Sequence, residues 1–291
     1  MTMRGKGDLC GFTLFNETAY GTPGTTKTFG GVLYSLETPS EETIEYDQAC
    51  GSRQWENMVR TMENYGWKAE FTMPSGTPTN WTQWFTFALG GLTGTISNDL
   101  NSFSALFRIA SNEHMDSCGC KVNSLTMSAD AMGAPIKFNV EAMAKKNTFA
   151  SGQGSPLARP STAPITYSTL WTRNGSSLAV KSWSLNIANN LVGDPGIDSS
   201  GFGLAAGSGS TPGGQSDITL DLTISSVDST FDILKQGNAT NDTLVLTMDG
   251  YTVTCTGCYM KSDYPTRGQA PYDETISYIV KGVTIAAVSS P

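Results

Sequence analysis

The stretch that decides the fold runs from Gly119 to Lys146 and reads GCKVNSLTMSADAMGAPIKFNVEAMAKK. On both sides of its centre, apolar residues alternate with polar ones; the apolar positions are Leu125, Met127 and Ala129, then Ile136, Phe138, Val140 and Ala142. A period of two is typical of β-strands with one buried and one solvated face. Because Gly133–Pro135 interrupts the pattern, the sequence predicts a β-hairpin with a buried core face.

The composition favours a mainly β protein. Only 38% of the 291 residues are hydrophobic and 15% are charged, with many glycines in between. Such a balance suits short strands joined by turns and argues against helical bundles and coiled coils. The net charge of −8 argues against a nucleic-acid-binding domain, because such binding neutralises phosphates. An acidic surface past which DNA slides without sticking fits the same charge.

The beginning of the chain, MTMRGKGD, has no apolar segment typical of a secretion signal. No run of apolar residues has membrane-spanning length. We therefore expect synthesis in the cytoplasm of a cell and no membrane partner.

Upstream of the hairpin the sequence predicts strands and one helix. Thr43–Cys50 alternates fairly well, and Trp67, Ala69, Phe71 and Met73 alternate cleanly with polar neighbours. Apolar residues then fall on one helical face, with Gly90 after the helix end; they are Trp81, Trp84, Phe85 and Ala88. We interpret this stripe as the face of a helix that covers the sheet, followed by a strand at Phe103–Ile109.

Four stretches are expected to be irregular. Residues 1–30 suggest an extended arm with turns, and residues 51–66 and 193–214 suggest long polar loops. Residues 147–164, rich in Ser, Gly, Pro and Ala, suggest a linker.

The second half repeats the order of the first: strand, long polar loop, strand, short helix, then strands. Its predicted strands begin with Trp183–Ile187 and Ile218–Ile224, and its helix, Ser226–Gly237, has a serine cap and a terminal glycine. Later strands are expected at Leu244–Met248, Tyr251–Met260 and Thr275–Ile285. We therefore predict two tandem β units, residues 1–150 (with the N-terminal arm) and residues 151–291, each with one short flanking helix.

Four of the six cysteines form close pairs in sequence, Cys118 with Cys120 and Cys255 with Cys258. They are weak candidates for a four-thiolate zinc site. The simpler interpretation is four small apolar residues in strands, since residues i and i+3 of a regular strand face opposite sides. A disulfide formed after release from a cell stays open.

No combination of residues predicts an active site. The one histidine, His114, lies in a polar segment without a nearby nucleophile motif. The sequence therefore predicts a protein that is not an enzyme and that needs no cofactor.

Several short segments resemble a family of phage tail tube proteins. They are Glu17–Pro23, Gly119–Met127, the strand Trp183–Asn190 and the terminal strand Thr275–Ile285. The resemblance implies a β-sandwich or half-barrel with a flanking helix, and a structural protein in a virion tail. It also implies copies of the chain itself as partners, together with tape measure, tail terminator and tail tip proteins.

From this resemblance we expect stacked rings around a channel through which viral DNA passes without specific binding. A half-open sheet has unpaired edges that neighbouring copies can pair, which closes a ring. If both units contribute, three chains make a ring; a ring of six chains is the alternative. A decoration or carbohydrate-binding β-sandwich module of a virion is the alternative function.

One polar strand face is then expected to point into the channel. The candidates are Glu45, Asp47, Lys68, Glu70, Asp217, Thr219, Asp221 and Thr223. Carboxylates there would repel DNA phosphates. The alternative is that these faces meet outside solvent.

Overall fold

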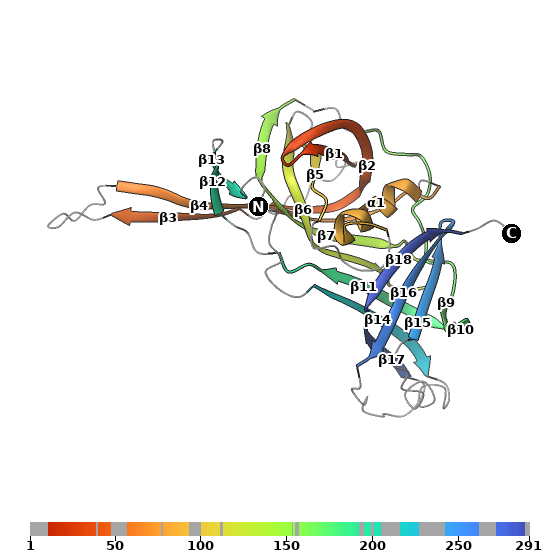
Figure 1. Ribbon diagram of the computed structural model, residues 1–291. Coiled ribbons are helices and arrows are strands. Elements are labelled where there is room, and N and C mark those ends of the chain that lie inside the picture. Colours follow the sequence, from red (N-terminus) through yellow and green to blue (C-terminus); the bar gives the residue numbers. More distant parts are fainter. Residues whose placement is uncertain are drawn as a thin grey trace.

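The computed structural model describes residues 11–38, 40–47, 57–76, 78–92, 100–110, 113–152, 154, 157–191, 195–198, 201–204, 216–226, 242–261 and 272–288 (Figure 1). For residues 40–47, 57–64, 78–79, 110, 195–198, 201–204, 225–226, 272 and 274 it describes the backbone alone. The described part is mainly β, as expected, with a single α-helix in it. No helix in these ranges is long and apolar enough to cross a membrane.

The elements of the first half are β1 (Phe12–Ala19), β2 (Thr22–Glu37), β3 (Ser40–Asp47), β4 (Asn57–Thr72), α1 (Pro78–Leu89), β5 (Phe103–Ala110), β6 (Glu113–Ala129), β7 (Lys137–Ala144) and β8 (Lys146–Ser151). Those of the second half are β9 (Trp171–Arg173), β10 (Ser176–Leu178), β11 (Val180–Ala188), β12 (Pro195–Asp198), β13 (Gly201–Leu204), β14 (Asp217–Ser226), β15 (Asp242–Met248), β16 (Tyr251–Met260), β17 (Tyr272–Ile279) and β18 (Gly282–Ala287).

The strands of the first half pair in a closed circuit. The antiparallel order is β1–β2–β4–β7–β6–β5 and back to β1, because the long strand β2 leaves β1 and then pairs with β4. Strand β8 pairs with β6 from outside this circuit. The predicted hairpin is confirmed as β6 and β7. We expected a half-open sheet, but the circuit is closed, because β1 pairs with β5 and β2 pairs with β4.

The strands of the second half repeat this order. Strand β9 pairs with β10, β11 with β14, β14 with β17, β17 with β16, β16 with β15, and β15 with β9. Only Ala179 separates β10 from β11, so the two together occupy the place that β2 has in the first circuit. Strand β18 pairs with β16 as β8 does with β6. Of the helix predicted at Ser226–Gly237, only Ser226 is described, as the last residue of β14; the rest lies outside the described residues.

Irregular positions also recur in both circuits. Between the pairs Ser117–Ala105 and Cys120–Phe103, β6 has one residue more than its partner β5. Between the pairs Cys255–Leu244 and Cys258–Asp242, β16 likewise has one residue more than its partner β15. Each extra residue sits beside a glycine with positive φ, Gly119 (65°) and Gly257 (61°). Such bulges bend a strand. The bend lets β6 and β16 change neighbours midway along their length.

One sheet runs through both halves. Strand β11 pairs with β6 from Trp183–Ala129 to Ala188–Ser124, so that the order β4–β7–β6–β11–β14–β17 is uninterrupted (Figure 1). We call the β6–β11 contact the seam. The two halves are therefore joined by a hydrogen-bonded strand pair as well as by the chain between them.

Several stretches that we expected to be irregular contain strands. Strands β1 and β2 occupy most of the predicted N-terminal arm, β4 begins inside the predicted loop 51–66, and β8 takes the first residues of the predicted linker. Strands β12 and β13 form a short hairpin within 193–214. These predictions failed because Gly and Thr weaken the alternation although the backbone still pairs. The predicted strand Thr275–Ile285 is broken at Val280–Lys281 into β17 and β18.

An aromatic core fills the first circuit, and α1 covers it. Phe12, Phe71 and Trp84 pack within 5.9 Å of one another between ring centroids, and Phe12 stacks on Phe107 at 4.9 Å. The Trp84 indole donates a hydrogen bond of 3.0 Å to the carbonyl oxygen of Gly30. The apolar stripe of α1 is confirmed as core, since Trp81, Trp84, Phe85 and Ala88 are fully buried.

Candidate functional site

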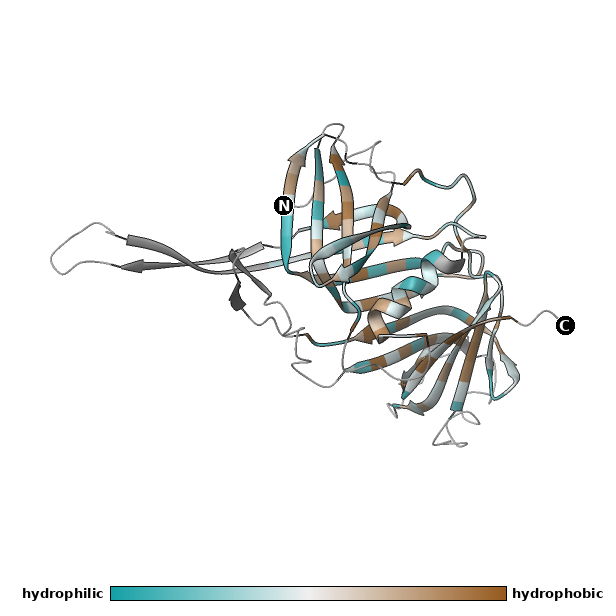
Figure 2. Cartoon of the chain, turned by 45° about the horizontal axis from the view of Figure 1, so that its top comes forward, coloured by the Kyte–Doolittle hydropathy of each residue, from teal (hydrophilic) through white to brown (hydrophobic). Residues whose placement is uncertain are grey.

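The shared sheet has one apolar and one polar face. The apolar face joins the cores of both halves in cross-strand rows such as Phe71, Phe138, Met127, Leu185, Leu220 and Tyr278. All six are buried. Figure 2 shows the alternation as brown and teal bands along the strands. We call the opposite side of β4, β7, β6, β11, β14 and β17 the polar face.

Three cross-strand rows make up most of the polar face, and their residues are exposed or partly exposed apart from Thr72, which extends the third row on β4 and is buried. The first row is Lys68, Glu141, Ser124, Ala188 and Asp217. The second is Glu70, Asn139, Thr126, Asn186, Thr219 and Ile279, and the third is Lys137, Ser128, Ser184, Asp221 and Ser277. Across the seam, the Thr126 hydroxyl donates a 2.9 Å hydrogen bond to the side-chain oxygen of Asn186.

The structure thus brings together candidates that the sequence could only group by strand. Lys68 and Asp217 share one row, and Glu70 and Thr219 share the next, although they come from different halves. Asp221 and Thr223 lie on the same side of β14. Glu45 and Asp47 lie on β3, where the side chains are outside the described part.

The polar face is acidic because its carboxylates outnumber its lysines. Lys121, on the same side of β6, is buried; the carboxylates that solvent reaches are Glu70, Glu141, Asp217, Asp221 and Asp273, with Glu37 beside Lys68 on the adjoining β2, and the lysines that it reaches are Lys68, Lys137 and Lys181. Each of these three lysines is paired: Lys68 with Glu141 at 3.1 Å, Lys137 with Asp130 at 2.7 Å, and Lys181 with Asp273 at 2.5 Å. These pairs are substantially exposed, so each contributes little stability. Within the described ranges, Asp217 and Asp221 of β14 take part in no ion pair, so their negative charge is not compensated there.

The four cysteines lie in the bent strands and are free thiols. Burial raises the pKa of Cys120 and of Cys258 to about 12, and raises that of Cys255 well above its usual range. The Gly257 bulge turns Cys258 back to the buried side that holds Cys255, so the alternation argument for opposite faces was wrong here. The described ranges contain no cluster of three or more His, Cys, Asp or Glu side chains suited to a metal ion.

Glu17 is a structural residue that the sequence reasoning missed. Its carboxylate accepts hydrogen bonds from the Ser104 hydroxyl (2.6 Å), the Gly119 backbone N–H (2.7 Å) and the Gly21 backbone N–H (2.8 Å). It therefore ties the β1–β2 turn and β5 to the bend of β6. Two of the segments that carry the family resemblance, Glu17–Pro23 and Gly119–Met127, meet at this carboxylate.

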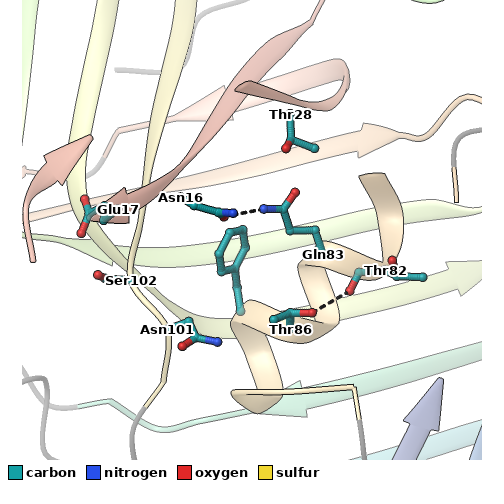
Figure 3. A pocket seen from close by; sticks show the side chains of 9 residues that line it. Asn16, Glu17, Thr28, Thr82, Gln83, Thr86, Asn101 and Ser102 are labelled. Atoms are coloured by element: carbon teal, nitrogen blue, oxygen red, sulfur yellow. Dashed lines mark hydrogen bonds between the residues drawn. The ribbon is translucent and has the colours of Figure 1, made fainter. Parts of the chain in front are cut away.

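A hollow of about 620 Å³ lies between α1, β1 and β2 (Figure 3). Amides and hydroxyls line it, and the Gln83 amide nitrogen donates a 2.6 Å hydrogen bond to the Asn16 side-chain oxygen across it. Its one carboxylate is Glu17, which already holds three structural hydrogen bonds. Among the described residues the lining contains no histidine, lysine or cysteine.

Comparison with protein families matches residues 11–278 to the phage tail tube protein family. The match spans both strand circuits and the seam between them. The chain belongs to this family, and its role is that of a structural component of a virion tail. A comparison with curated proteins returns no match.

Proposed function

We propose that the chain polymerises into stacked rings whose polar faces line the channel through which viral DNA passes. The observation that carries the proposal is the uninterrupted sheet with one acidic polar face and one buried face. A wall that DNA passes must repel phosphates and present no base-reading or phosphate-binding cluster. The paired lysines and the free carboxylates of β14 meet both conditions.

We propose further that residues 1–150 and 151–291 are two copies of one tube unit. The repeated pairing order, the repeated bulges and the external strands β8 and β18 support this division. Two units per chain favour three chains in a ring with six quasi-equivalent positions. By the same resemblance, the end rings would meet tape measure, terminator and tip proteins.

Electron microscopy of the purified protein tests assembly directly. We expect rings or tubes whose end views show six quasi-equivalent lobes, and native mass spectrometry of single rings should give three chains. Persistent monomers at high protein concentration would contradict the polymerisation proposal. Six chains per ring would contradict the two-unit wall and favour the second half as an outer decoration.

The lining is tested by reversing charge on β14. The double variant Asp217→Lys/Asp221→Lys should assemble into tails of normal length but deliver DNA more slowly, because lysines would hold passing phosphates. The matched control is Glu113→Lys/Asp116→Lys, which changes the charge equally on exposed residues of β6 in the β5–β6–β8 wall. Equal delivery by both variants, with normal tails, would remove the polar face from the channel.

A further inference from the structure

The seam inside the chain has a defined register. Strand β11 follows β6 from Trp183 to Ala188, and the pairing continues with a 2.8 Å hydrogen bond from the Asn189 backbone N–H to the Asn123 carbonyl oxygen. The buried Asn189 side chain donates further bonds of 2.9 Å to the carbonyl oxygens of Val122 and Ala88. The end of the seam is therefore fixed by the Asn189–Asn123 pair.

The first circuit contains the counterpart of the β11 side of this seam. Strand β2 carries its extra residue at Tyr34 and β11 carries its own at Lys181, so the two strands align from these bulges. The alignment extends from β2 into β3 because both strands pair with β4 in the same register. Glu37 of β2 lies opposite Lys68, and three residues further along on each side Ser40 of β3 lies opposite Tyr65. Counted this way, Glu42 stands where Asn189 stands in the seam.

In the part of the chain that the structure describes, no strand covers this counterpart edge. From Val32 onward, β2 pairs with β4 on one side, and β3 does the same; on the other side no strand of the described ranges pairs with them. In β11 the equivalent edge is covered by β6. An unpaired strand edge is a template for another chain. Tyr34, at the start of this edge, is 58% exposed.

The second circuit contains the counterpart of the β6 side. The Gly119 and Gly257 bulges align β6 with β16, which places Met260 at the position of Val122 and Lys261 at that of Asn123. The positions that correspond to Ser124–Ala129 fall at 262–267, outside the described residues, so the alignment rests on the end of β16 and on Lys261. Val122 is fully buried beneath the seam, whereas Met260 is only partly buried. Next to it, the cross-strand pair Tyr259–Ile279 exposes large apolar side chains, 44% and 46% accessible.

We propose that the seam is repeated between chains, so that the β2–β3 edge of one copy takes the end of β16 of the next copy. This rests on the ring proposed above and names its interface. In the shared register, Glu42 of one copy lies opposite Lys261 of the next, as Asn189 lies opposite Asn123 within the chain. The contact is head-to-tail between unlike halves, which closes into a ring when the rotation allows. The polar face then continues from β17 of one copy to β4 of the next.

The sequence at the two seams differs in a way that fits this assignment. The internal seam ends in a neutral Asn–Asn pair, while the positions assigned to the external seam are acidic and basic. Opposite charges across an interface select register and disfavour wrong partners. A head-to-tail contact between chains needs such selection more than a pair within one chain does.

Disulfide trapping tests the register. Glu42→Cys/Lys261→Cys should give cross-linked dimers and trimers in most chains of assembled rings on oxidation, because directly opposed residues bring Cβ atoms within about 5.5 Å. The single variants control for native cysteines, and Glu42→Cys/Lys281→Cys is the off-register control. Rings that form without cross-linking above these controls would overturn the seam and leave the ring itself standing. Failure of the unsubstituted chain to form rings would overturn both.

Charge reversal gives an independent readout without cysteines. Glu42→Lys and Lys261→Glu should each raise the protein concentration needed for ring assembly about fivefold, the effect of losing one ion pair. The double reversal should restore the original concentration. If the double variant instead needed a still higher protein concentration than either single variant, Glu42 and Lys261 would not lie opposite each other.

Discussion

The bend in β6 yields a sharp prediction, because Gly119 combines a positive φ with close contact. Its φ is 65°, and a Cβ added there would lie 2.5 Å from the Cβ of Lys145. The left-handed conformation costs an alanine about 1–2 kcal/mol. Overpacking against a neighbour that cannot withdraw costs about 1–3 kcal/mol more. Gly119→Ala should therefore lower the free energy of unfolding by about 2–5 kcal/mol.

Gly133→Ala is the matched control, since Gly133 has a φ of 83° but nothing within 4 Å of an added Cβ. Urea unfolding of both variants, followed by tryptophan fluorescence, should show a loss of about 1–2 kcal/mol for the control, from conformation alone. Gly257→Ala should behave like Gly119→Ala, because its added Cβ would lie 2.7 Å from the Cβ of Lys281.

The contact itself is isolated by a double variant. Lys145→Gly removes the opposing Cβ, so Gly119→Ala should cost less in that background than alone. Equal losses for Gly119→Ala and Gly133→Ala, or no coupling with Lys145→Gly, would refute the reasoning from close approach.

Two further outcomes concern buried polar groups. Asp242→Ala should lower the free energy of unfolding by about 3–5 kcal/mol, because it leaves the largely buried Arg173 guanidinium, 2.6 Å from the carboxylate, without its charge partner. Glu141→Ala, which removes one member of an exposed pair, should lower it by less than about 1 kcal/mol. Similar losses in the two variants, measured by chemical denaturation, would contradict this. Stability should also fall as pH rises above 9.0, the ordinary pKa of a cysteine thiol, toward 12, since the buried Cys120 and Cys258 thiols stay protonated in the fold and ionise in the unfolded chain. The slope measured by urea unfolding should reach about 1.4 kcal/mol per pH unit per thiol, and replacing both cysteines by alanine should reduce it by their share while the share of the buried Cys255 remains.

Much of the local structure was predictable because a strand or helix that is buried on one side carries apolar residues at regular intervals. The alternation around Leu125 and Phe138 located the hairpin, and the stripe that contains Trp84 located α1. Gly-rich and Thr-rich strands escaped detection, as Thr22–Glu37 shows, since their pairing rests on backbone groups that every residue carries. Glu17 escaped for a related reason: its three donors come from segments far apart in the chain.

The sequence by itself determined the strand faces, the helix and the acidic balance, because these depend on side-chain order along the chain. Only the tertiary structure decided that β1 and β2 close the first circuit, that β11 pairs with β6, and that Lys68 and Asp217 share one row. The hairpin from Gly119 to Lys146 consequently has β11 as an additional neighbour. Strand neighbours are chosen by hydrogen bonds between distant segments, and register follows from bulges whose position alternation alone does not reveal.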